Sequence, residues 1–290
     1  MSSLSSISIY AFQKKRTMKK ITILGVALLA TVALSACDNK KEPAQKADNA
    51  PVVLKVAATP VPHGEILRFV APQLKKDGVD LQITEFTDFI SPNTALADKS
   101  VDANYYQHIP FLENAMANKG YKFSIVSPIH ILPMAAYSEK VKDLKDLQQG
   151  AKVSIPNDPS NGGRALLLLE KGGVLKLKPN VGSKATTLDI VENPKGLKIV
   201  EVEAAQVPRT LKDVDVAVAN SNYAIGVGLN PLKDSILLED KDSPFVVVLA
   251  TRTGDEKKPE VQKLAKALKS KETKDFMNEK YKGSVVPLKD

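Results

Sequence analysis

A short polar segment, PNDPSNGGR at residues 156–164, contains a residue well suited to binding a negatively charged ligand. Arg164 has a planar guanidinium that matches the geometry of a carboxylate or a phosphate. Ser160 and Asn161 are residue types that begin helices, and the apolar run after Arg164 predicts a helix. The unpaired N–H groups at the start of a helix also attract anions. The segment is either an ordinary turn or an anion receptor, and these residues alone leave both interpretations open.

A second group of side chains lies in residues 86–93 (FTDFISPN) and 102–112 (DANYYQHIPFL). The chain has only 8 Phe, 7 Tyr and 3 His, yet these two segments contain Phe86, Phe89, Tyr105, Tyr106, His108 and Phe111. Aromatic side chains normally pack in a core. The polar residues between them make 102–112 a poor core segment, so we favour a half-apolar wall beside a pocket.

Catalytic and metal-binding chemistry has little support in the sequence. His63, His108 and His130 lack the spacing of a zinc site, although distant ligands could still assemble one. Neither a G-x-S-x-G nor a G-x-x-x-x-G-K-[ST] motif occurs. Glu201 and Glu203 share one face of a predicted strand and are more typical of a solvated edge than of catalytic acids. We therefore expect no enzyme activity, no metal and no cofactor.

The first 36 residues have the pattern of a secretory signal peptide. A basic segment precedes the apolar residues 21–36, a stretch shorter than the roughly 20 residues that span a bilayer. The sequence LSAC at 34–37 resembles the lipobox of bacterial lipoproteins, which implies that Cys37, the only cysteine, is acylated. Asp38 then favours the periplasmic face of the inner membrane. The outer membrane or the cell surface is the alternative.

Residues 37–51 predict a lipidated cysteine followed by a flexible polar tether. The signal peptide holds five of the 41 Lys and Arg and none of the 33 Asp and Glu, which leaves 36 against 33, a net charge of +3. The basic character of the whole chain therefore belongs mainly to export. Because no basic, aromatic-interleaved motif is present, we do not expect a nucleic-acid partner. The single cysteine also excludes an intramolecular disulfide.

From residue 52 onward, strand and helix patterns alternate. The predicted strands are 52–58, 79–86, 123–129, 134–138, 151–156, 197–204, 214–220 and 245–252, and the predicted helices are 65–76, 111–120, 143–150, one containing 165–169, and one or two in 259–282. This alternation predicts an α/β fold with mainly parallel sheets, as one large sheet or two lobes. Ligands bind beyond the carboxyl ends of such strands. Two strands end beside Arg164 and Asn220, which favours the receptor interpretation.

Five segments resemble the NlpA family of methionine-binding lipoproteins. They are KVAATPVPHGEIL (55–67), FTDFISPNTALADKSVDANYYQHIPFL (86–112), PNDPSNGGRALLLLEKGG (156–173), DIVENPKGLKIVEVEAAQVPRTL (189–211) and VAVANSNYAIGVGL (216–229). The resemblance extends over residues 52–290. It implies a two-lobed periplasmic binding protein fold with a ligand cleft and two inter-lobe crossovers, near 132–135 and 243–246. Lobe 1 would comprise 52–134 and 245–290, and lobe 2 would comprise 135–244.

The resemblance also implies a set of ligand-binding residues. Arg164 would bind the α-carboxylate of an amino acid, with support from Asn161 and the helix N-terminus. Asn220 would help hold the amino-acid backbone. The pocket for the ligand side chain would be lined by His108, Phe111, Phe89 and Tyr106, with Phe86 as a further candidate.

The function implied by the family is capture of methionine and its delivery to an ABC permease and ATPase, by a protein expected to be a monomer. Relatives often have tyrosine where Phe89 and Phe111 stand, which leaves open the choice among L-methionine, D-methionine, the sulfoxide and short Met peptides. Relatives often have a bulkier residue where Gly162 stands, which predicts a looser helix entrance. The alternative is that the protein is a surface lipoprotein that keeps this fold but serves in interaction or adhesion instead of transport.

Overall fold

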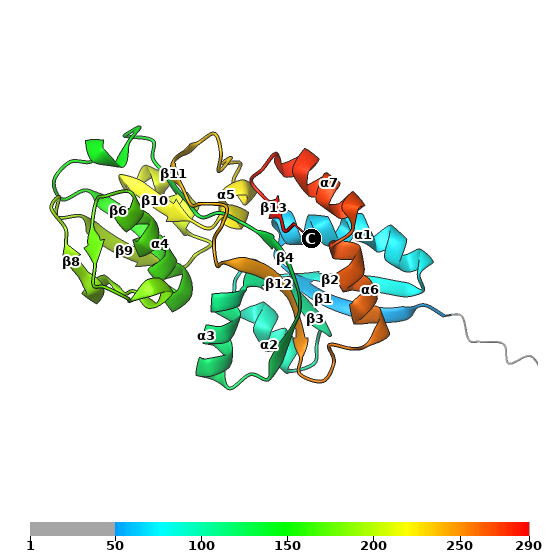
Figure 1. Cartoon of the computed structure of the whole chain (residues 1–290). Coiled ribbons are helices and arrows are strands. Elements are labelled where there is room, and N and C mark those ends of the chain that lie inside the picture. The colour runs from blue at the N-terminus through cyan, green and yellow to red at the C-terminus, as the bar shows by residue number, and fades with distance from the viewer. Residues whose placement is uncertain (1–49, 290) are drawn as a thin grey trace, which may run out of the picture. The chain divides into compact units, whose positions relative to one another are not determined.

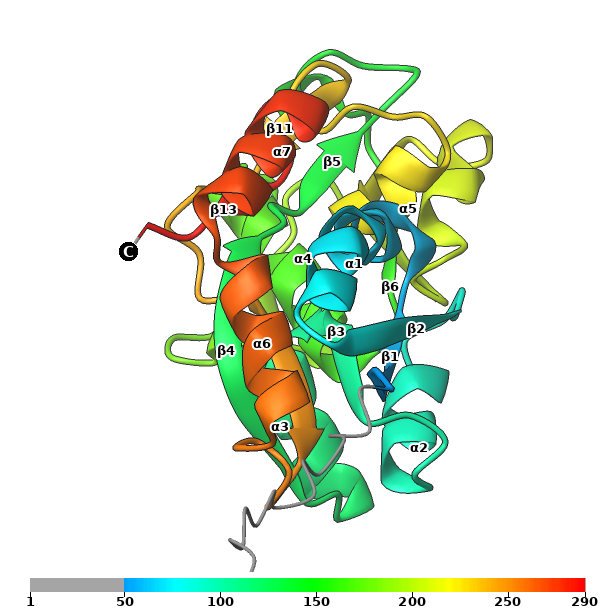
Figure 2. The same ribbon diagram turned by 90° about the vertical axis from the view of Figure 1, so that its right-hand side faces the viewer.

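Two β-sheets flanked by helices make up residues 50–289, the part of the chain that the computed structural model describes (Figure 1, Figure 2). The predicted signal peptide, Cys37 and nearly all of the predicted tether lie outside these residues. The first sheet consists of β1 (Val52–Ala58), β2 (Val79–Glu85), β3 (Ala103–His108), β4 (Phe123–Ile131), β12 (Val246–Arg252) and β13 (Val286–Pro287). Its spatial order is β13-β4-β12-β3-β1-β2.

The second sheet is built from the middle of the chain. Its strands are β5 (Ala135–Tyr137), β6 (Lys152–Pro156), β9 (Lys198–Val202), β10 (Val216–Ala219) and β11 (Ser235–Leu238), in the order β11-β5-β10-β6-β9. A separate two-stranded ladder pairs β7 (Lys176–Leu177) with β8 (Ile190–Glu192).

Helices pack against both faces of each sheet. On the first sheet, one face is covered by α1 (Glu65–Lys76), α6 (Pro259–Leu268) and α7 (Lys271–Tyr281), and the other by α2 (Ser91–Ala97) and α3 (Ile109–Lys119). On the second sheet, α4 (Pro159–Lys171) lies on one face, while η5 (Val207–Lys212) and α5 (Ser221–Gly226) lie on the other. The remaining short helices are η1 (Pro60–Gly64), η2 (Leu144–Asp146), η3 (Gly182–Lys184) and η4 (Thr187–Asp189).

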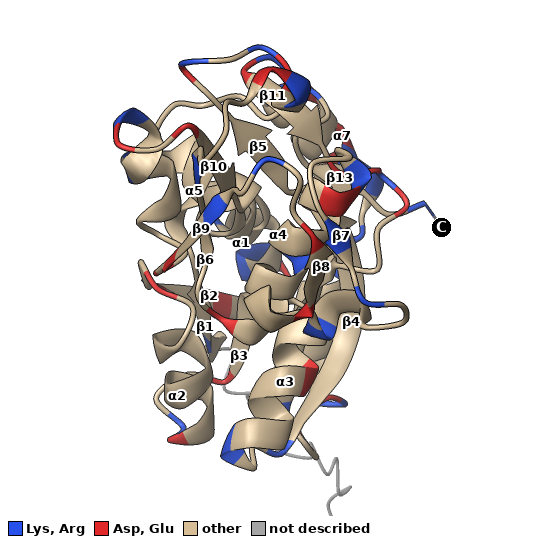
Figure 3. Ribbon diagram, turned by 90° about the vertical axis from the view of Figure 1, so that its left-hand side faces the viewer, with Lys and Arg blue, Asp and Glu red and all other residues tan. Residues whose placement is uncertain are grey.

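Alternating side chains explain why each sheet is covered on two sides. In β10, Val216 and Val218 pack toward α4, whereas Ala217 and Ala219 pack toward α5. Successive residues of a strand point to opposite faces, so an unbroken apolar strand requires a cover on each face. Charged residues are accordingly concentrated in loops and on helices, with basic and acidic segments interspersed on the face shown in Figure 3.

Both sheets are mixed, so the prediction of mainly parallel sheets was wrong. β1 pairs in parallel with β2 and β3, but β12 runs antiparallel to both β3 and β4. In the second sheet, β6 is parallel to β9 and β10, and β5 is antiparallel to β10 and β11. β3 and β4 end on the side of the first sheet that faces the second sheet. The chain returns from the second sheet on this side, so β12 starts beside the ends of β3 and β4 and runs antiparallel to both.

The two predicted crossovers are confirmed. The chain leaves the first sheet after β4, enters the second at β5 through residues 132–134, and returns from β11 to β12 through residues 239–245. Both connections can be followed in Figure 1 between the two halves of the molecule. They also bond to each other, because the N–H of Glu239 donates to the carbonyl of Met134 at 2.9 Å.

The prediction that 102–112 is a poor core segment was wrong for its first half. All six residues of β3 are buried. Its polar side chains are accommodated by mutual hydrogen bonds: the amide groups of Asn93, Asn104 and Gln107 join one another at 2.8–2.9 Å. A buried amide costs little when all of its partners are supplied, so β3 can be both a central strand and a pocket wall.

The helix predicted at 143–150 was also wrong, because only the turn of η2 forms there. The side chain of Asp143 accepts the N–H of Lys145 at 2.8 Å, which favours a short capped turn. Among residues 50–289, no helix has the length and apolar character needed to cross a bilayer.

Candidate functional site

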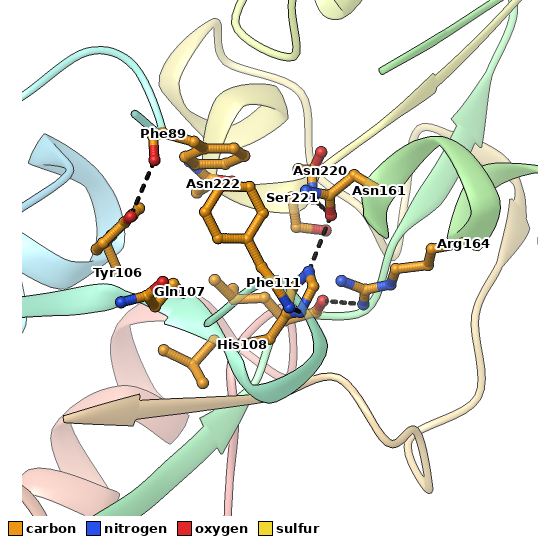
Figure 4. Close-up of a pocket in the computed structure, with 12 residues that line it drawn as sticks. Phe89, Tyr106, Gln107, His108, Phe111, Asn161, Arg164, Asn220, Ser221 and Asn222 are labelled. Atoms are coloured by element: carbon orange, nitrogen blue, oxygen red, sulfur yellow. Dashed lines mark hydrogen bonds between the residues drawn. The ribbon is translucent and has the colours of Figure 1, made fainter. Parts of the chain in front are cut away.

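A pocket that is partly open to solvent lies between the two sheets, and its empty space amounts to about 350 Å³, part of which is open solvent (Figure 4). Its lining residues are Phe89, Tyr106, Gln107, His108, Phe111, Leu132, Asn161, Arg164, Asn220, Ser221, Asn222 and Val247. Seven of the eight predicted ligand-binding residues are in this set, although they are far apart in sequence. The structure therefore brings them together, and their role in binding stays a prediction.

Phe86 is the predicted residue that the structure places elsewhere. It packs against the buried cluster beneath α2, which includes Ala57, Ala95 and Leu96. Phe86 comes directly after β2, and its N–H donates to the carbonyl of Ala58 at 2.9 Å, which continues the pairing of β1 with β2. This backbone pairing fixes the residue over the sheet, away from the pocket.

The two sheets contribute different chemistry to the pocket. The end of β3, the start of α3 and the loop before α2 supply aromatic side chains and His108. The first turns of α4 and the junction of β10 with α5 supply Arg164 and four polar residues, namely Asn161, Asn220, Ser221 and Asn222. The carboxyl ends of β3 and β10 thus meet at the pocket, as expected for open α/β sheets.

Helix α4 begins earlier than predicted, and an acidic side chain caps its first turn. Asp158 is the N-cap residue and Pro159 occupies the first turn, a combination typical of helix starts. The carboxylate of Asp158 accepts the N–H of Asn161 at 2.9 Å. Asp158 therefore binds this end of the helix, and the expected support of Arg164 by the helix N-terminus stays a prediction. Burial raises the pKa of Asp158, and its bonds to Asn161 oppose this shift.

Gly162 allows a close approach rather than a loose entrance to α4. A Cβ atom at this position would lie 2.9 Å from the carbonyl oxygen of Pro156. The neighbouring Gly163 is tighter still, since a Cβ there would lie 2.3 Å from the carbonyl oxygen of Ser183. The glycine pair thus lets the helix pack directly on two backbone segments.

A hydrogen-bond network centred on Asn161 crosses the pocket from one sheet to the other. The Asn161 Nδ2 atom donates to the carboxylate of Asp158 at 3.0 Å, which leaves Oδ1 as the acceptor. That oxygen receives Asn220 Nδ2 at 2.7 Å and lies 3.0 Å from His108 Nε2. Because His108 Nδ1 accepts the N–H of Phe111 at 3.2 Å, the proton of the neutral ring belongs on Nε2.

His108 is held in its neutral form. Burial, together with the nearby positive charge of Arg164, lowers the pKa of His108 to about 3. The neutral ring can donate to Asn161 and cap α3 at the same time, and a protonated ring would lose the second interaction. His108 is therefore a fixed hydrogen-bonding link between the two sheets.

Arg164 is almost fully buried, and its strongest partner is a residue that the sequence did not reveal. Its Nε donates to Glu239 Oε1 at 3.0 Å, and its Nη2 forms an ion pair with Glu239 Oε2. Nη2 also donates to the carbonyl of Leu132 at 2.8 Å. The guanidinium stacks on Phe245, with Cζ 4.2 Å from the ring centre. These three bonds use three of the five N–H groups of arginine, so only the two on Nη1 remain for a ligand.

Two further buried polar atoms beside the pocket have no hydrogen-bond partner within residues 50–289. They are Asn220 Oδ1, an acceptor, and Asn222 Nδ2, a donor. A buried polar atom without a partner carries a desolvation cost, which a polar ligand can remove by supplying the missing bond. Together with Arg164 Nη1, these atoms present donors for an anionic group and an acceptor for a cationic one.

The opposite side of the pocket is an aromatic wall. The ring of Phe89 lies 5.7 Å from that of Phe111 and 6.0 Å from that of Tyr106. The hydroxyl of Tyr106 donates to the carbonyl of Phe89 at 2.9 Å, so it is already engaged. Tyr223 of α5 extends the wall, since its ring is 4.7 Å from Phe89 and its hydroxyl donates to the carbonyl of Thr87 at 3.1 Å.

The sequence interpretation missed Ser221, Asn222 and Tyr223, although they directly follow the predicted Asn220. Their position after a strand that ends at the pocket was a usable signal. It missed Gln107 for a different reason, because a polar residue inside a buried strand has no periodic pattern. No group of three or more His, Cys, Asp or Glu side chains in the described part of the chain is arranged to hold a metal ion.

Two lobes joined by paired connections, with a polar anchor facing an aromatic wall between them, define a two-lobed substrate-binding protein. The chain belongs to the NlpA lipoprotein family, which matches residues 54–289. It is 41% identical over 265 residues to the D-methionine-binding lipoprotein MetQ of Escherichia coli K12, covering 90% of this chain and 94% of that protein.

Solved structures are similar over the same region. A nutrient binding protein from Burkholderia cenocepacia bound to methionine is 47% identical, with a TM-score of 0.79 and coverage of 81% of this chain and 99% of that one. A periplasmic substrate-binding protein of an ABC transporter from Coxiella burnetii is 40% identical, with a TM-score of 0.77 and coverage of 81% and 100%.

Proposed function

We propose that this protein is a lipid-anchored receptor that captures methionine between its lobes and delivers it to an ABC importer. The observation that carries the proposal is the position of Arg164 Nη1 and the unpartnered Asn220 Oδ1 opposite an aromatic wall. Such a pocket offers an anion donor, a cation acceptor and an apolar surface, which are the three features that a zwitterionic amino acid with an apolar side chain requires. The names of the relatives from Escherichia coli and Burkholderia cenocepacia supply the particular ligand.

Each part of the ligand has a proposed partner. The carboxylate binds Arg164 Nη1, and the ammonium group binds Asn220 Oδ1. The thioether packs against Phe89 and Phe111, where each sulfur–aromatic contact contributes roughly 0.3–1.5 kcal/mol. Tyr106, His108 and Asn161 shape the pocket from its two sides. Phe86 has no place in this assignment.

We assign the lobes by the sheet that each segment builds. Residues 52–134 and 245–290 form lobe 1, and residues 135–244 form lobe 2. This division places every strand of the six-stranded sheet in lobe 1 and every strand of the five-stranded sheet in lobe 2. The ligand would then be held between rigid bodies that move about residues 132–134 and 239–245.

The membrane anchor and the partners follow from the N-terminal residues and from the relatives. Cys37 carries the lipid after removal of residues 1–36, and Asp38 favours the periplasmic face of the inner membrane. The protein acts as a monomer and docks to the permease and ATPase of a methionine importer. Loss of membrane attachment in Cys37→Ser, measured by fractionation of cells, tests the anchor.

The binding assignment is tested by native mass spectrometry and calorimetry of the mature lipoprotein, stripped of copurified ligand and titrated with L-methionine and D-methionine. We expect one-to-one binding, and we expect Arg164→Ala to weaken it at least about tenfold, because a hydrogen bond to a charged group contributes roughly 1.5–3 kcal/mol. The matched control is Arg209→Ala, which removes an exposed arginine. A folded Arg164→Ala variant with unchanged methionine affinity would contradict the assignment.

A further inference from the structure

Glu239 lies outside the set of residues that line the pocket, yet it contacts the residue proposed to bind the ligand carboxylate. It follows β11 directly and begins the connection 239–245 that returns the chain to the first sheet. Its side chain is only 15% exposed. The carboxylate therefore occupies a largely buried position between the pocket and the two connections.

The bonds of Glu239 join the two connections to each other. Its Oε2 atom accepts the N–H of Met134 at 3.0 Å, and its own N–H donates to the carbonyl of Met134 at 2.9 Å. The same Oε2 accepts Arg164 Nη2, and Oε1 accepts Arg164 Nε. One side chain thus ties together both connections and the arginine of α4.

Every fixed contact of the Arg164 guanidinium that the described residues show is made with these connections. Leu132 belongs to the first, and Glu239 and Phe245 belong to the second. The edge formed by Nε and Nη2, which would otherwise suit a bidentate carboxylate, is occupied by Glu239. Nη1 is the one guanidinium nitrogen without a fixed partner among the described residues, and Arg164 lines the pocket.

We propose that Glu239 is a positioning residue for ligand binding, which fixes the guanidinium of Arg164 so that Nη1 alone serves the ligand carboxylate. This inference rests on the proposed function of Arg164. A carboxylate is required because three donors converge on its two oxygen atoms. An amide at position 239 offers only one acceptor oxygen, and its NH₂ group would face a donor from Arg164 or Met134.

The first test compares methionine with methioninamide, which lacks the carboxylate, in titrations of the mature lipoprotein. We expect Glu239→Gln to weaken methionine binding by about tenfold or more, as for other buried charge pairs that lose one partner, and to change methioninamide binding by less than about threefold. The matched control is Asp240→Asn, which removes the adjacent carboxylate, bonded at the surface to Lys171 at 2.6 Å. Equal weakening of both ligands, or unchanged or tighter methionine binding, overturns the proposal.

The second test is a double-mutant cycle with Arg164→Ala. If Glu239 acts through Arg164, adding Glu239→Gln to Arg164→Ala causes no further loss of methionine affinity, and removal of an unpaired negative charge can raise it. Additive losses overturn the proposal. Circular dichroism and thermal unfolding identify any variant that fails to fold, and Arg164→Lys serves as the second variant if Arg164→Ala does so.

A third measurement needs no ligand and separates this inference from the proposed function. In ¹H–¹⁵N spectra, the Nε–H of Arg164, identified by its loss in Arg164→Lys, should exchange slowly in the unmodified protein and in Asp240→Asn, and rapidly in Glu239→Gln. Slow exchange in Glu239→Gln overturns the positioning role even if the unmodified protein binds methionine. Absence of methionine binding by the unmodified protein would instead refute the proposed function.

Discussion

At the scale of residues, the site depends on how few polar atoms remain free. The side-chain amide of Asn161 is hydrogen-bonded to Asp158, His108 and Asn220, and the hydroxyl of Tyr106 is hydrogen-bonded to a backbone carbonyl. The aromatic end of the pocket therefore offers carbon surfaces to the ligand. The polar atoms of the ligand must find their partners at the opposite end. A thioether is compatible with such a surface, whereas the oxygen of a sulfoxide would lose its hydrogen bonds to water without replacement.

This division predicts how selectivity can be changed. We expect Phe111→Tyr or Phe89→Tyr to improve binding of methionine sulfoxide relative to methionine, by up to about tenfold, because one added hydrogen bond contributes about 0.5–1.5 kcal/mol. Competition titrations with the two ligands measure the ratio. Phe276→Tyr is the control and should leave the ratio unchanged, because this half-buried ring stacks on Phe69 and does not line the pocket. A ratio that stays constant in both pocket variants would contradict this account.

At the scale of elements, the segments of lobe 2 that form the site are held by close backbone packing and by contacts across the pocket. The first turn of α4 approaches the backbone of 183–185 so closely that only glycine fits at position 163. Tyr223 of α5 reaches across to the loop before α2 and bonds to the carbonyl of Thr87. The first contact sets the position of Arg164, and the second joins the two lobes at the mouth of the pocket.

Gly163→Ala should lower the free energy of unfolding by about 1–3 kcal/mol, because the added Cβ would overlap the carbonyl oxygen of Ser183. Urea unfolding measures the change. Gly226→Ala is the matched control: it is also helical, a Cβ there meets nothing within 4 Å, and we expect no loss and a gain of up to about 1 kcal/mol. Equal stability of the two variants would refute the packing argument.

Tyr223→Phe should speed ligand release by about two- to tenfold, because it removes one hydrogen bond between the lobes and keeps the ring against Phe89. The association rate should change little, as is usual for contacts formed after encounter. Stopped-flow fluorescence with a displaceable ligand measures both rates. Tyr121→Phe, which changes a tyrosine beneath α2, provides the control. An unchanged release rate would mean that this bond does not hold the lobes together.

Much of the fold could be predicted because apolar periodicity is local. The predicted bounds of 52–58 and 65–76 coincide with β1 and α1. β3 was not predicted as a strand because its buried amides are stabilised by Asn93, a contact visible only in three dimensions. For the same reason, the sequence indicated Arg164 as a site residue but not its partner Glu239. Glu239 is 75 residues away and does not belong to any recognisable sequence motif.

At the scale of the whole molecule, all three histidines are buried and uncharged. Burial, with a contribution from His130, lowers the pKa of His63, and burial lowers the pKa of His130 to about 3. The ring centres of His63 and His130 lie 5.4 Å apart within lobe 1. His63 is hydrogen-bonded to the hydroxyl of Thr59, and His130 is hydrogen-bonded to the hydroxyl of Tyr105. His108 behaves likewise in the pocket. In mild acid the unfolded chain would therefore bind three protons, one at each histidine, that the folded protein does not bind.

Stability should consequently fall as the pH drops below about 6.5, the ordinary pKa of histidine. Each folded-state pKa is lower than its unfolded value, so the unfolded chain binds more protons and gains free energy on acidification. From pH 6 to pH 5 the loss should be roughly 3.5–4 kcal/mol for three histidines, measured by urea unfolding. His130→Gln should reduce this pH dependence by about one third. A free energy of unfolding that is constant between pH 7 and pH 5 would contradict the prediction.

The separate origin of the two ends of the pocket has a practical consequence for engineering. Arg164 lies in α4, but its partners Glu239 and Leu132 belong to the chain segments about which the lobes would move. Phe89 and Phe111 line the pocket from lobe 1. A designer of biosensors can therefore alter the aromatic rim to accept another amino acid while the hinge and its built-in carboxylate clamp stay intact. A fluorophore placed near residues 132–134 or 239–245 would then report the new analyte through the same movement as the old one.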